Sequence, residues 1–168
     1  MGAVIVSSDP GEVLTAHAED LLRYFRRRVG DDDAPDLLGE TLMTAWRRVA
    51  VLPSGSEAAR MWLFGVAHHV LLNHRRGIRR RLRLAARLQE VLTTTPSDPA
   101  ADAGVEVRDA IDRLPPARAE LVRLVHWEGF TLAQAAEIMR MPASTVRNHY
   151  QQAKQELRLA LQPAPARD

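Results

Sequence analysis

The stretch from Ser144 to Gln155 carries polar side chains whose types and spacing suit contact with nucleic acid. It reads STVRNHYQQAKQ, and within it Val146, Tyr150 and Ala153 recur at helical spacing. A rotation of about 100° per residue places most of the amide, hydroxyl and guanidinium groups opposite that apolar stripe. Such groups hydrogen-bond to base edges in the major groove of DNA. The candidates for this contact are Ser144, Thr145, Arg147, Asn148, Gln151, Gln152, Lys154 and Gln155, of which Lys154 is better placed for phosphates.

A second candidate surface is a block of arginines. No acidic residue occurs between Ala58 and Gln89, and this stretch holds Arg75, Arg76, Arg79, Arg80, Arg81, Arg83 and Arg87. A block of one sign on a helical pattern predicts phosphate binding. The alternative is an ordinary solvated helix face, which is the usual meaning of a charge run. The net charge of the whole chain, +2, does not decide between them.

Several other kinds of chemistry are disfavoured. The chain has no cysteine, which excludes disulfides and thiolate metal ligands. His69 and His74 are five residues apart, off a common helical face, so neither a metal nor a cofactor is expected. No glycine-rich phosphate loop or nucleophile motif is present, which makes an enzyme the weakest class. Without a long apolar run or a signal peptide we expect no membrane insertion and a cytoplasmic protein.

Helical periodicity predicts the elements that position these residues in the first half of the chain. A first helix with its apolar stripe from Leu14 to Val29 should end at Gly30. A second should begin near Pro35, and a third, long helix should begin near Glu57 with Ser56 as its N-cap. The residues expected to point inward from the second helix are Leu38, Leu42, Ala45, Trp46 and Val49.

The segment after the arginine block has a different composition. It contains threonines, prolines, aspartates and alanines, which predicts a flexible linker over residues 93–104. Helical patterns resume beyond it, interrupted at Pro115-Pro116 and Gly129, and no segment shows a period of two. The sequence therefore predicts an all-α protein with two small helical domains, over residues 10–92 and 105–162.

The second domain should contain a helix-turn-helix. Thr131 and Gln134 form a capping-box pattern that opens one short helix, Met141-Pro142-Ala143 makes the turn, and Ser144 can cap the next helix. Arg140 stands where such turns often have glycine, and a left-handed arginine there would cost about 1 kcal/mol. The alternative is a plain helical hairpin with a solvated polar face.

Three segments in this order resemble the extracytoplasmic-function (ECF) sigma factors, the compact bacterial class with only regions 2 and 4. The segments are residues 36–48 (DLLGETLMTAWRR), residues 62–76 (WLFGVAHHVLLNHRR) and residues 110–161, within a resemblance that covers about residues 14–161. It implies a protein that binds core RNA polymerase and directs promoter-specific transcription initiation. It also implies that the polymerase does the chemistry and that the protein works on the nucleoid when bound to polymerase.

The resemblance assigns roles to individual residues. Asp36, Leu37, Glu40 and Thr41 would bind the clamp helices of the polymerase, and the apolar surface around Leu121 to Trp127 would serve its flap. Asn73, Arg75, Arg76, Arg79 and Arg80 would hold the melted minus-ten region, with residues 52–56 receiving a flipped base. The helix-turn-helix would read the minus-thirty-five element as duplex. An anti-sigma factor is a further partner that the resemblance allows.

Three positions depart from the family pattern. Members commonly have basic residues where this chain has His149 and Gln152, and often glutamine or a similar polar residue where it has Gly39. Fewer charges should weaken nonspecific phosphate binding, and a glycine inside a helix costs about 1 kcal/mol relative to alanine. The main alternative is an ordinary helix-turn-helix regulator that is not a polymerase subunit. The helical, arginine-rich first half argues against it, because a sensor domain would normally show strands.

Overall fold

The computed structural model describes residues 9–89 and 103–162, and it divides the chain into two compact units at Leu92 and Thr93. The described residues form helices and contain no strand, so the all-α prediction is confirmed. No helix in these two ranges is long and apolar enough to cross a membrane. Residues 93–102 of the predicted linker lie outside the described residues, and residues 103 and 104 belong to a helix.

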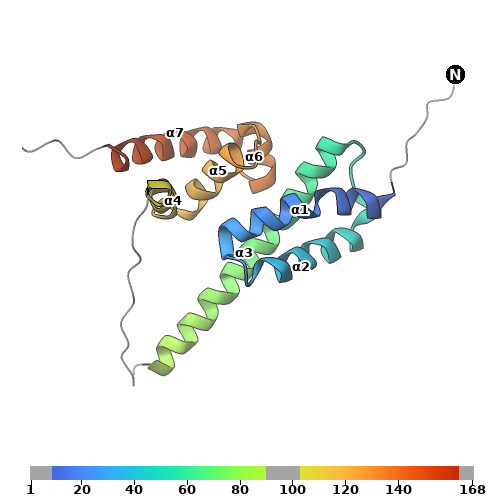
Figure 1. Ribbon diagram of the computed structural model, residues 1–168, viewed down its shortest axis with the longest axis horizontal. Coiled ribbons are helices and arrows are strands. Elements are labelled where there is room, and N and C mark those ends of the chain that lie inside the picture. Colours follow the sequence, from blue (N-terminus) through green and yellow to red (C-terminus); the bar gives the residue numbers. More distant parts are fainter. Residues whose placement is uncertain (1–8, 90–102, 163–168) are drawn as a thin grey trace, which may run out of the picture. The chain divides into compact units, whose positions relative to one another are not determined.

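The first unit contains three helices that pack against one another (Figure 1): α1 (Pro10–Val29), α2 (Ala34–Arg47) and α3 (Ser56–Gln89). A short 3-10 turn, η1 (Val49–Val51), follows α2. Asp9 caps α1 by accepting a hydrogen bond from the backbone N–H of Gly11 at 3.2 Å. Gly30 ends that helix as predicted, with a φ of 85° that favours glycine. The end of α3 extends past α1 and α2, and it carries the arginine block.

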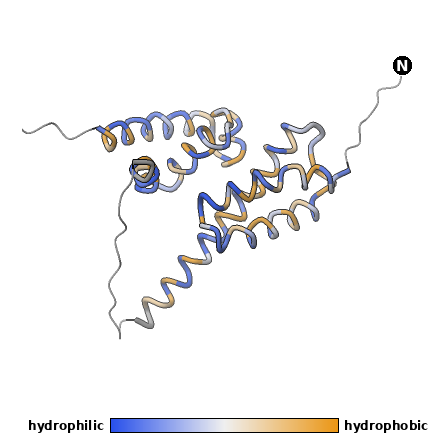
Figure 2. Tube along the Cα trace, in the orientation of Figure 1, coloured by the Kyte–Doolittle hydropathy of each residue, from blue (hydrophilic) through white to orange (hydrophobic). Residues whose placement is uncertain are grey.

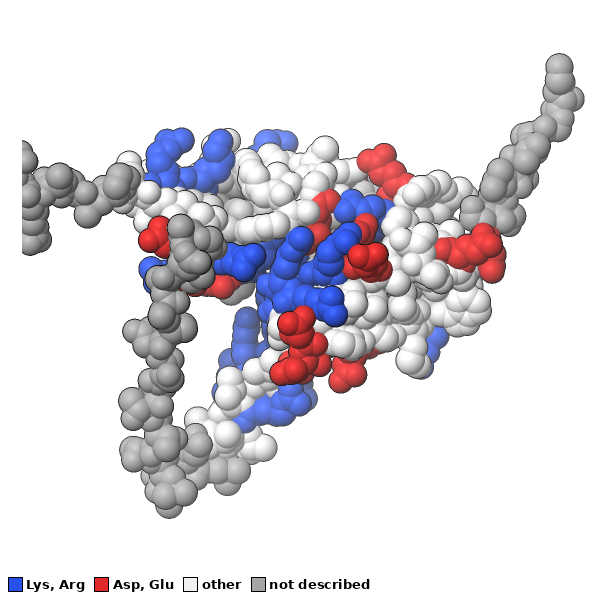
Figure 3. All heavy atoms as spheres, in the orientation of Figure 1, with Lys and Arg blue, Asp and Glu red and all other residues white. Residues whose placement is uncertain are grey.

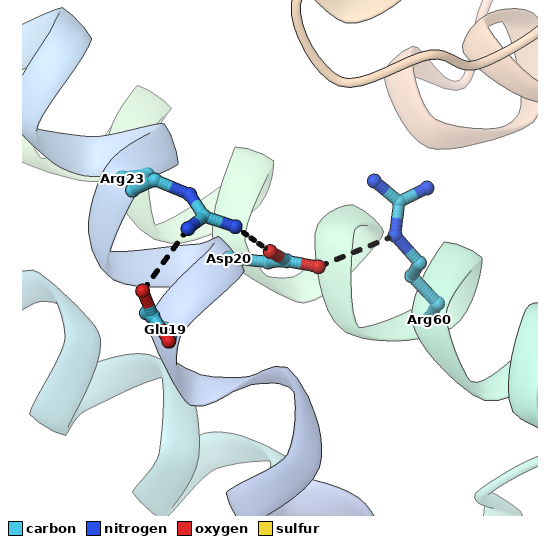
Figure 4. Close-up of polar contacts among 4 residues, drawn as sticks. All are labelled: Glu19, Asp20, Arg23 and Arg60. Carbon is cyan, nitrogen blue, oxygen red and sulfur yellow. Dashed lines mark hydrogen bonds and ion pairs between the residues drawn. The ribbon is translucent and has the colours of Figure 1, made fainter.

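Aromatic and aliphatic side chains fill the core between these helices. Tyr24 contacts Phe25 and Phe64 edge-to-face, with ring centroids 5.1 and 5.4 Å apart. The Arg28 guanidinium lies over the Tyr24 ring at 3.6 Å from its centroid. At the surface, Asp20 on α1 pairs with Arg23 and lies 3.8 Å from Nε of Arg60 on α3 (Figure 4). Burial of the aromatic cluster therefore holds α1 to α3, and these partly exposed ion pairs add little.

The phase of α2 differs from the prediction. Its buried residues are Ala34, Leu37, Thr41 and Ala45, whereas Leu38 and Leu42 are only partly buried. Trp46, expected to point inward, is 56% exposed. The reason is that α2 packs against both α1 and α3, and the small side chains of Ala34, Thr41 and Ala45 allow close approach on that face.

The described part of the second unit contains four helices: α4 (Ala103–Asp112), α5 (Pro116–His126), α6 (Leu132–Met139) and α7 (Ala143–Ala160). Figure 2 shows hydrophilic and hydrophobic residues alternating along α7, as expected for an amphipathic helix. Its buried Ala153 and half-buried Leu157 pack into a core with Ile111, Leu114, Ala119 and Val122. This core holds α7 against α4 and α5 and leaves its other side at the surface.

Candidate nucleic-acid interface

The first helix of the predicted helix-turn-helix is α6, and its N-terminus is capped as the sequence indicates. The backbone N–H of Gln134 donates to Thr131 Oγ1 at 3.2 Å, and the backbone N–H of Thr131 donates to Gln134 Oε1 at 2.9 Å. This reciprocal pair confirms the capping box. The inner face of α6 carries Ala135, Ala136, Ile138 and Met139, all buried.

A left-handed residue connects α6 to the turn. Arg140 has φ 53° and ψ 46°, and it is the only residue other than glycine with positive φ in the described ranges. The backbone N–H of Met141 donates to the carbonyl of Ala136 at 2.9 Å, which closes the C-terminus of α6. The structure thus places an arginine in the left-handed conformation for which helix-turn-helix turns often have glycine.

The second helix, α7, begins two residues earlier than a cap at Ser144 would give. Its N-cap is Pro142, and no side-chain hydrogen bond caps it, so the prediction that Ser144 is the cap is wrong. The fixed φ of Pro142, −57°, sets the direction of the chain entering the helix. Ser144 instead lies in the first turn and is exposed, so its hydroxyl belongs to the outward face.

Most of the predicted recognition residues share that outward face. Val146 and Ala153 are buried, and Tyr150 is partly buried, which fixes the rotation of α7. The exposed residues opposite them are Ser144, Asn148, Gln151 and Gln155, and the exposed Arg147 and Lys154 adjoin these on one flank. From Ser144 to Gln155 the helix rises about 16 Å, and a major groove about 12 Å wide admits such a helix.

Two predicted recognition residues lie apart from this face. Thr145 and Gln152 are partly buried, and the helical rotation puts them with His149 on one flank of α7. This flank includes both positions at which the family often has basic residues. The structure therefore brings six of the eight candidates together and leaves Thr145 and Gln152 at the edge.

A contact that the sequence reasoning missed joins α7 to α5. His126 Nε2 and Tyr150 Oη are 2.9 Å apart, and the two rings stack with centroids separated by 6.0 Å. The Lys154 ammonium lies 5.7 Å from the Tyr150 ring centroid. Helical spacing marked Tyr150 as apolar, but nothing in the sequence indicated that its hydroxyl would meet a residue 24 positions earlier. This contact joins the inward side of α7 to α5.

The second candidate surface lies on the projecting part of α3. Asn73, Arg76, Arg79 and Arg80 are exposed, and Arg75 is partly buried. Helical rotation places these five within about half of the circumference of the helix. Figure 3 shows Lys and Arg atoms along this part of the chain. The loop expected to receive a base, residues 52–56, includes Gly55 with a φ of 93°. Trp62, near the start of α3, is partly buried.

The predicted polymerase-binding residues separate into two groups. Asp36 and Glu40 are exposed on α2. Leu37 is 4% exposed and Thr41 is fully buried, with its Oγ1 donating to the carbonyl of Leu37 at 2.7 Å. The expectation that the Leu37 and Thr41 side chains bind a partner is therefore corrected, because the packing of α2 against two helices encloses them.

The surface expected to serve the flap is likewise smaller than predicted. Leu121, Val122 and Leu124 on α5 are each 4% exposed or less, because they form the core beneath α6 and α7. Trp127, 37% exposed, is the large apolar side chain of that segment that reaches the surface.

Comparison with known proteins matches each half of the chain to a family model. Residues 13–81 match Sigma-70 region 2, and residues 104–157 match Sigma-70, region 4. The ECF RNA polymerase sigma factor SigL of Mycobacterium tuberculosis is 32% identical over 158 residues, which cover 87% of this chain and 85% of SigL. The ECF sigma factor SigC of the same species is 27% identical over 154 residues, covering 89% and 82%.

Two solved structures share the fold. The sigma factor RpoE in complex with the anti-sigma factor NepR, from Bartonella quintana, has a TM-score of 0.68 at 22% identity and covers 90% of this chain and 95% of that one. CnrH in complex with the cytosolic domain of CnrY has a TM-score of 0.61 at 20% identity, covering 90% and 86%. At these identities the likeness extends to the arrangement of helices alone.

Proposed function

Because the chain belongs to the ECF RNA polymerase sigma factors, we propose that its two candidate surfaces divide promoter recognition between them. A sigma factor binds core RNA polymerase and directs transcription initiation at specific promoters, and this is the function of the chain. The outward face of α7 reads the minus-thirty-five element as duplex, and the arginines of α3 hold the minus-ten region as it melts. The chain works in the cytoplasm and leaves the chemistry to the polymerase.

The observation that carries this assignment is the outward face of α7. The capped α6, the turn at Arg140 and the buried Val146 present Arg147, Asn148 and Gln151 together at the surface. In helix-turn-helix proteins the N-terminal part of the second helix contacts base edges. Arginine suits guanine, and asparagine and glutamine suit adenine. Lys154 lies two turns beyond Arg147 on α7, and we assign it to contacts with phosphates.

The minus-ten assignment is supported by charge and by helix geometry. A single strand is held by a basic groove that follows its backbone. Arg76, Arg79 and Arg80 are exposed on a helix segment that carries no carboxylate, so no acidic neighbour along the helix competes for them. We assign Asn73 and Arg75 to the same surface.

The surface for core polymerase is assigned to α2. Its residues are the exposed Asp36 and Glu40.

An anti-sigma factor is proposed as a regulatory partner. Two proteins of the same fold were solved with a bound partner, and RpoE of Bartonella quintana is bound to the anti-sigma factor NepR. Purification of the chain from its native host would show whether core polymerase or a partner of this class accompanies it.

Reconstituted transcription with core RNA polymerase from its own host and genomic promoter fragments tests the proposal. The full chain should stimulate initiation at a subset of fragments. Arg147→Ala and Asn148→Ala should lower the ratio of transcription from the best promoter to that from a mutated minus-thirty-five element. Arg79→Ala should weaken open-complex formation and leave that ratio unchanged. Tight binding to promoter DNA without polymerase, with no stimulation of initiation, would instead identify a helix-turn-helix regulator.

A further inference from the structure

A pair of polar side chains at the surface joins the end of α5 to α7. His126 Nε2 lies 2.9 Å from Tyr150 Oη, and this hydrogen bond is exposed. The two rings stack, with an angle of 20° between their planes. His126 is exposed and Tyr150 is partly buried, so the phenol ring is anchored while its hydroxyl lies at the surface. The structure thus holds one hydroxyl in a fixed place on the helix that is proposed to read DNA.

Cationic side chains continue from this hydroxyl along one flank of α7. Tyr150, Lys154 and Arg158 follow one another at four-residue intervals, so they lie on successive turns of the same side, here called the basic flank. Lys154 and Arg158 are exposed, and the Lys154 ammonium is 5.7 Å from the Tyr150 ring centroid. Such cations attract the phosphates of DNA. The Tyr150 hydroxyl therefore lies at one end of a phosphate-attracting row.

The opposite flank of α7 has no such row. It carries His149, Gln152 and Glu156. Glu156 is the only carboxylate of α7, and it forms an ion pair with Arg118 of α5. The charges of the two flanks therefore direct a DNA backbone toward the basic flank.

The hydrogen bond with His126 leaves the Tyr150 hydroxyl able to bind an anion. A phenol oxygen can accept one hydrogen bond and donate another. When the Nε2–H group of His126 donates to Oη, the phenol proton is left for a second acceptor. A charged phosphate oxygen is a strong acceptor, and tyrosine hydroxyls are among the groups that bind DNA phosphates.

We propose that Tyr150 Oη, oriented by His126, donates a hydrogen bond to one backbone phosphate of promoter DNA, next to a phosphate bound by Lys154. His126 is then a positioning residue that lies outside the two helices of the helix-turn-helix. The inference rests on the proposed function, which directs α7 at duplex DNA. It adds a DNA contact from a residue that helical periodicity assigns to the apolar stripe.

Binding of the full chain, assembled with core RNA polymerase from its own host, to a promoter fragment tests the proposal. Tyr150→Phe keeps the ring and removes the hydroxyl, and it should weaken binding about three- to tenfold. The dependence of affinity on salt should stay the same, because the lost donor is neutral. Lys154→Gln, by contrast, should reduce the steepness of log affinity against log salt by about 0.9.

Promoter fragments that carry a neutral methylphosphonate at a single position identify the phosphate itself. Replacement at the contacted position should weaken binding by the unchanged chain and have little further effect on Tyr150→Phe. A variant that merely loosened α7 would instead bind all fragments more weakly by the same factor.

Variants of the two histidines separate orientation of the hydroxyl from packing. His126→Ala should reproduce the loss of affinity caused by Tyr150→Phe, and His126→Gln, which keeps a donor, should restore most of it. His149→Ala is the matched control, because it removes a histidine from the opposite flank of α7, and it should bind the fragment as the unchanged chain does. Equal losses in His126→Ala and His126→Gln would reject His126 as the positioning residue.

The phosphate contact can fail without the function on which it rests. Unchanged affinity of Tyr150→Phe, with the same sensitivity to every methylphosphonate, would overturn the contact. If Asn148→Ala still lowered promoter discrimination in that case, the reading of the minus-thirty-five element by α7 would stand. If Asn148→Ala also left promoter choice unchanged, that reading would be rejected together with the contact.

Discussion

Replacement of Arg140 by glycine should stabilise the second unit. Arg140 has φ 53° between α6 and α7, where a Cβ atom lies too close to the backbone. The left-handed conformation costs a residue with a side chain about 1–2 kcal/mol. Glycine avoids that cost but loses about 0.5–1 kcal/mol through its greater freedom in the unfolded chain. Because the Arg140 side chain is exposed, its removal uncovers no buried group. The expected net gain is about 0.5–1 kcal/mol.

Native-state hydrogen exchange of the full chain measures this gain separately from the first unit. Amides of α6 and α7 report the opening of the second unit, and a gain of this size raises their protection about two- to fivefold. Amides of α1 should be unchanged and serve as the internal reference. The same measurement on Arg140→Ala should show no gain, because alanine keeps the Cβ. Arg140→Asn should fall between the two, since asparagine tolerates the left-handed region. Equal protection in the glycine and alanine variants would show that backbone strain at Arg140 is not the cause.

Three other predictions probe the fold. Thr131→Ala should destabilise the second unit by about 1 kcal/mol, because it removes the hydroxyl that accepts a hydrogen bond at the start of α6. Thr131→Ser keeps a hydroxyl and should retain most of that stability. Thermal unfolding of both variants checks this. Trp46→Ala should change the stability of the first unit by less than about 1 kcal/mol, because the Trp46 side chain is largely exposed. Phe64 is fully buried, and Phe64→Ala should cost about 3–5 kcal/mol. If urea unfolding showed comparable losses of stability for the two variants, the observed phase of α2 would be contradicted. Burial lowers the pKa of His17 below its usual 6.5, so the folded state binds fewer protons than the unfolded state. The stability of the first unit should therefore fall as the pH drops below about 6.5. If the variant His17→Gln kept the same pH dependence of stability, His17 would be excluded as its source.

The signals that the sequence carried reliably are local. The capping box at Thr131 and Gln134, the helix end at Gly30 and the left-handed residue at Arg140 each depend on a few neighbouring residues. The rotation of α7 was also predictable, because Val146 and Ala153 are apolar and the residues opposite them are polar. Backbone hydrogen bonding and helical periodicity act over one or two turns, so they can be inferred before the tertiary packing is known.

The tertiary structure decided what periodicity left ambiguous. Apolar residues occur on nearly every side of α2, so its own pattern does not single out the line from Ala34 to Ala45. Simultaneous packing against α1 and α3 selected that line, buried Leu37 and Thr41, and exposed Trp46. The His126–Tyr150 contact likewise depends on the docking of α5 against α7. Which side chains remain for partners is set by burial against other helices, and that burial is a property of the assembled fold.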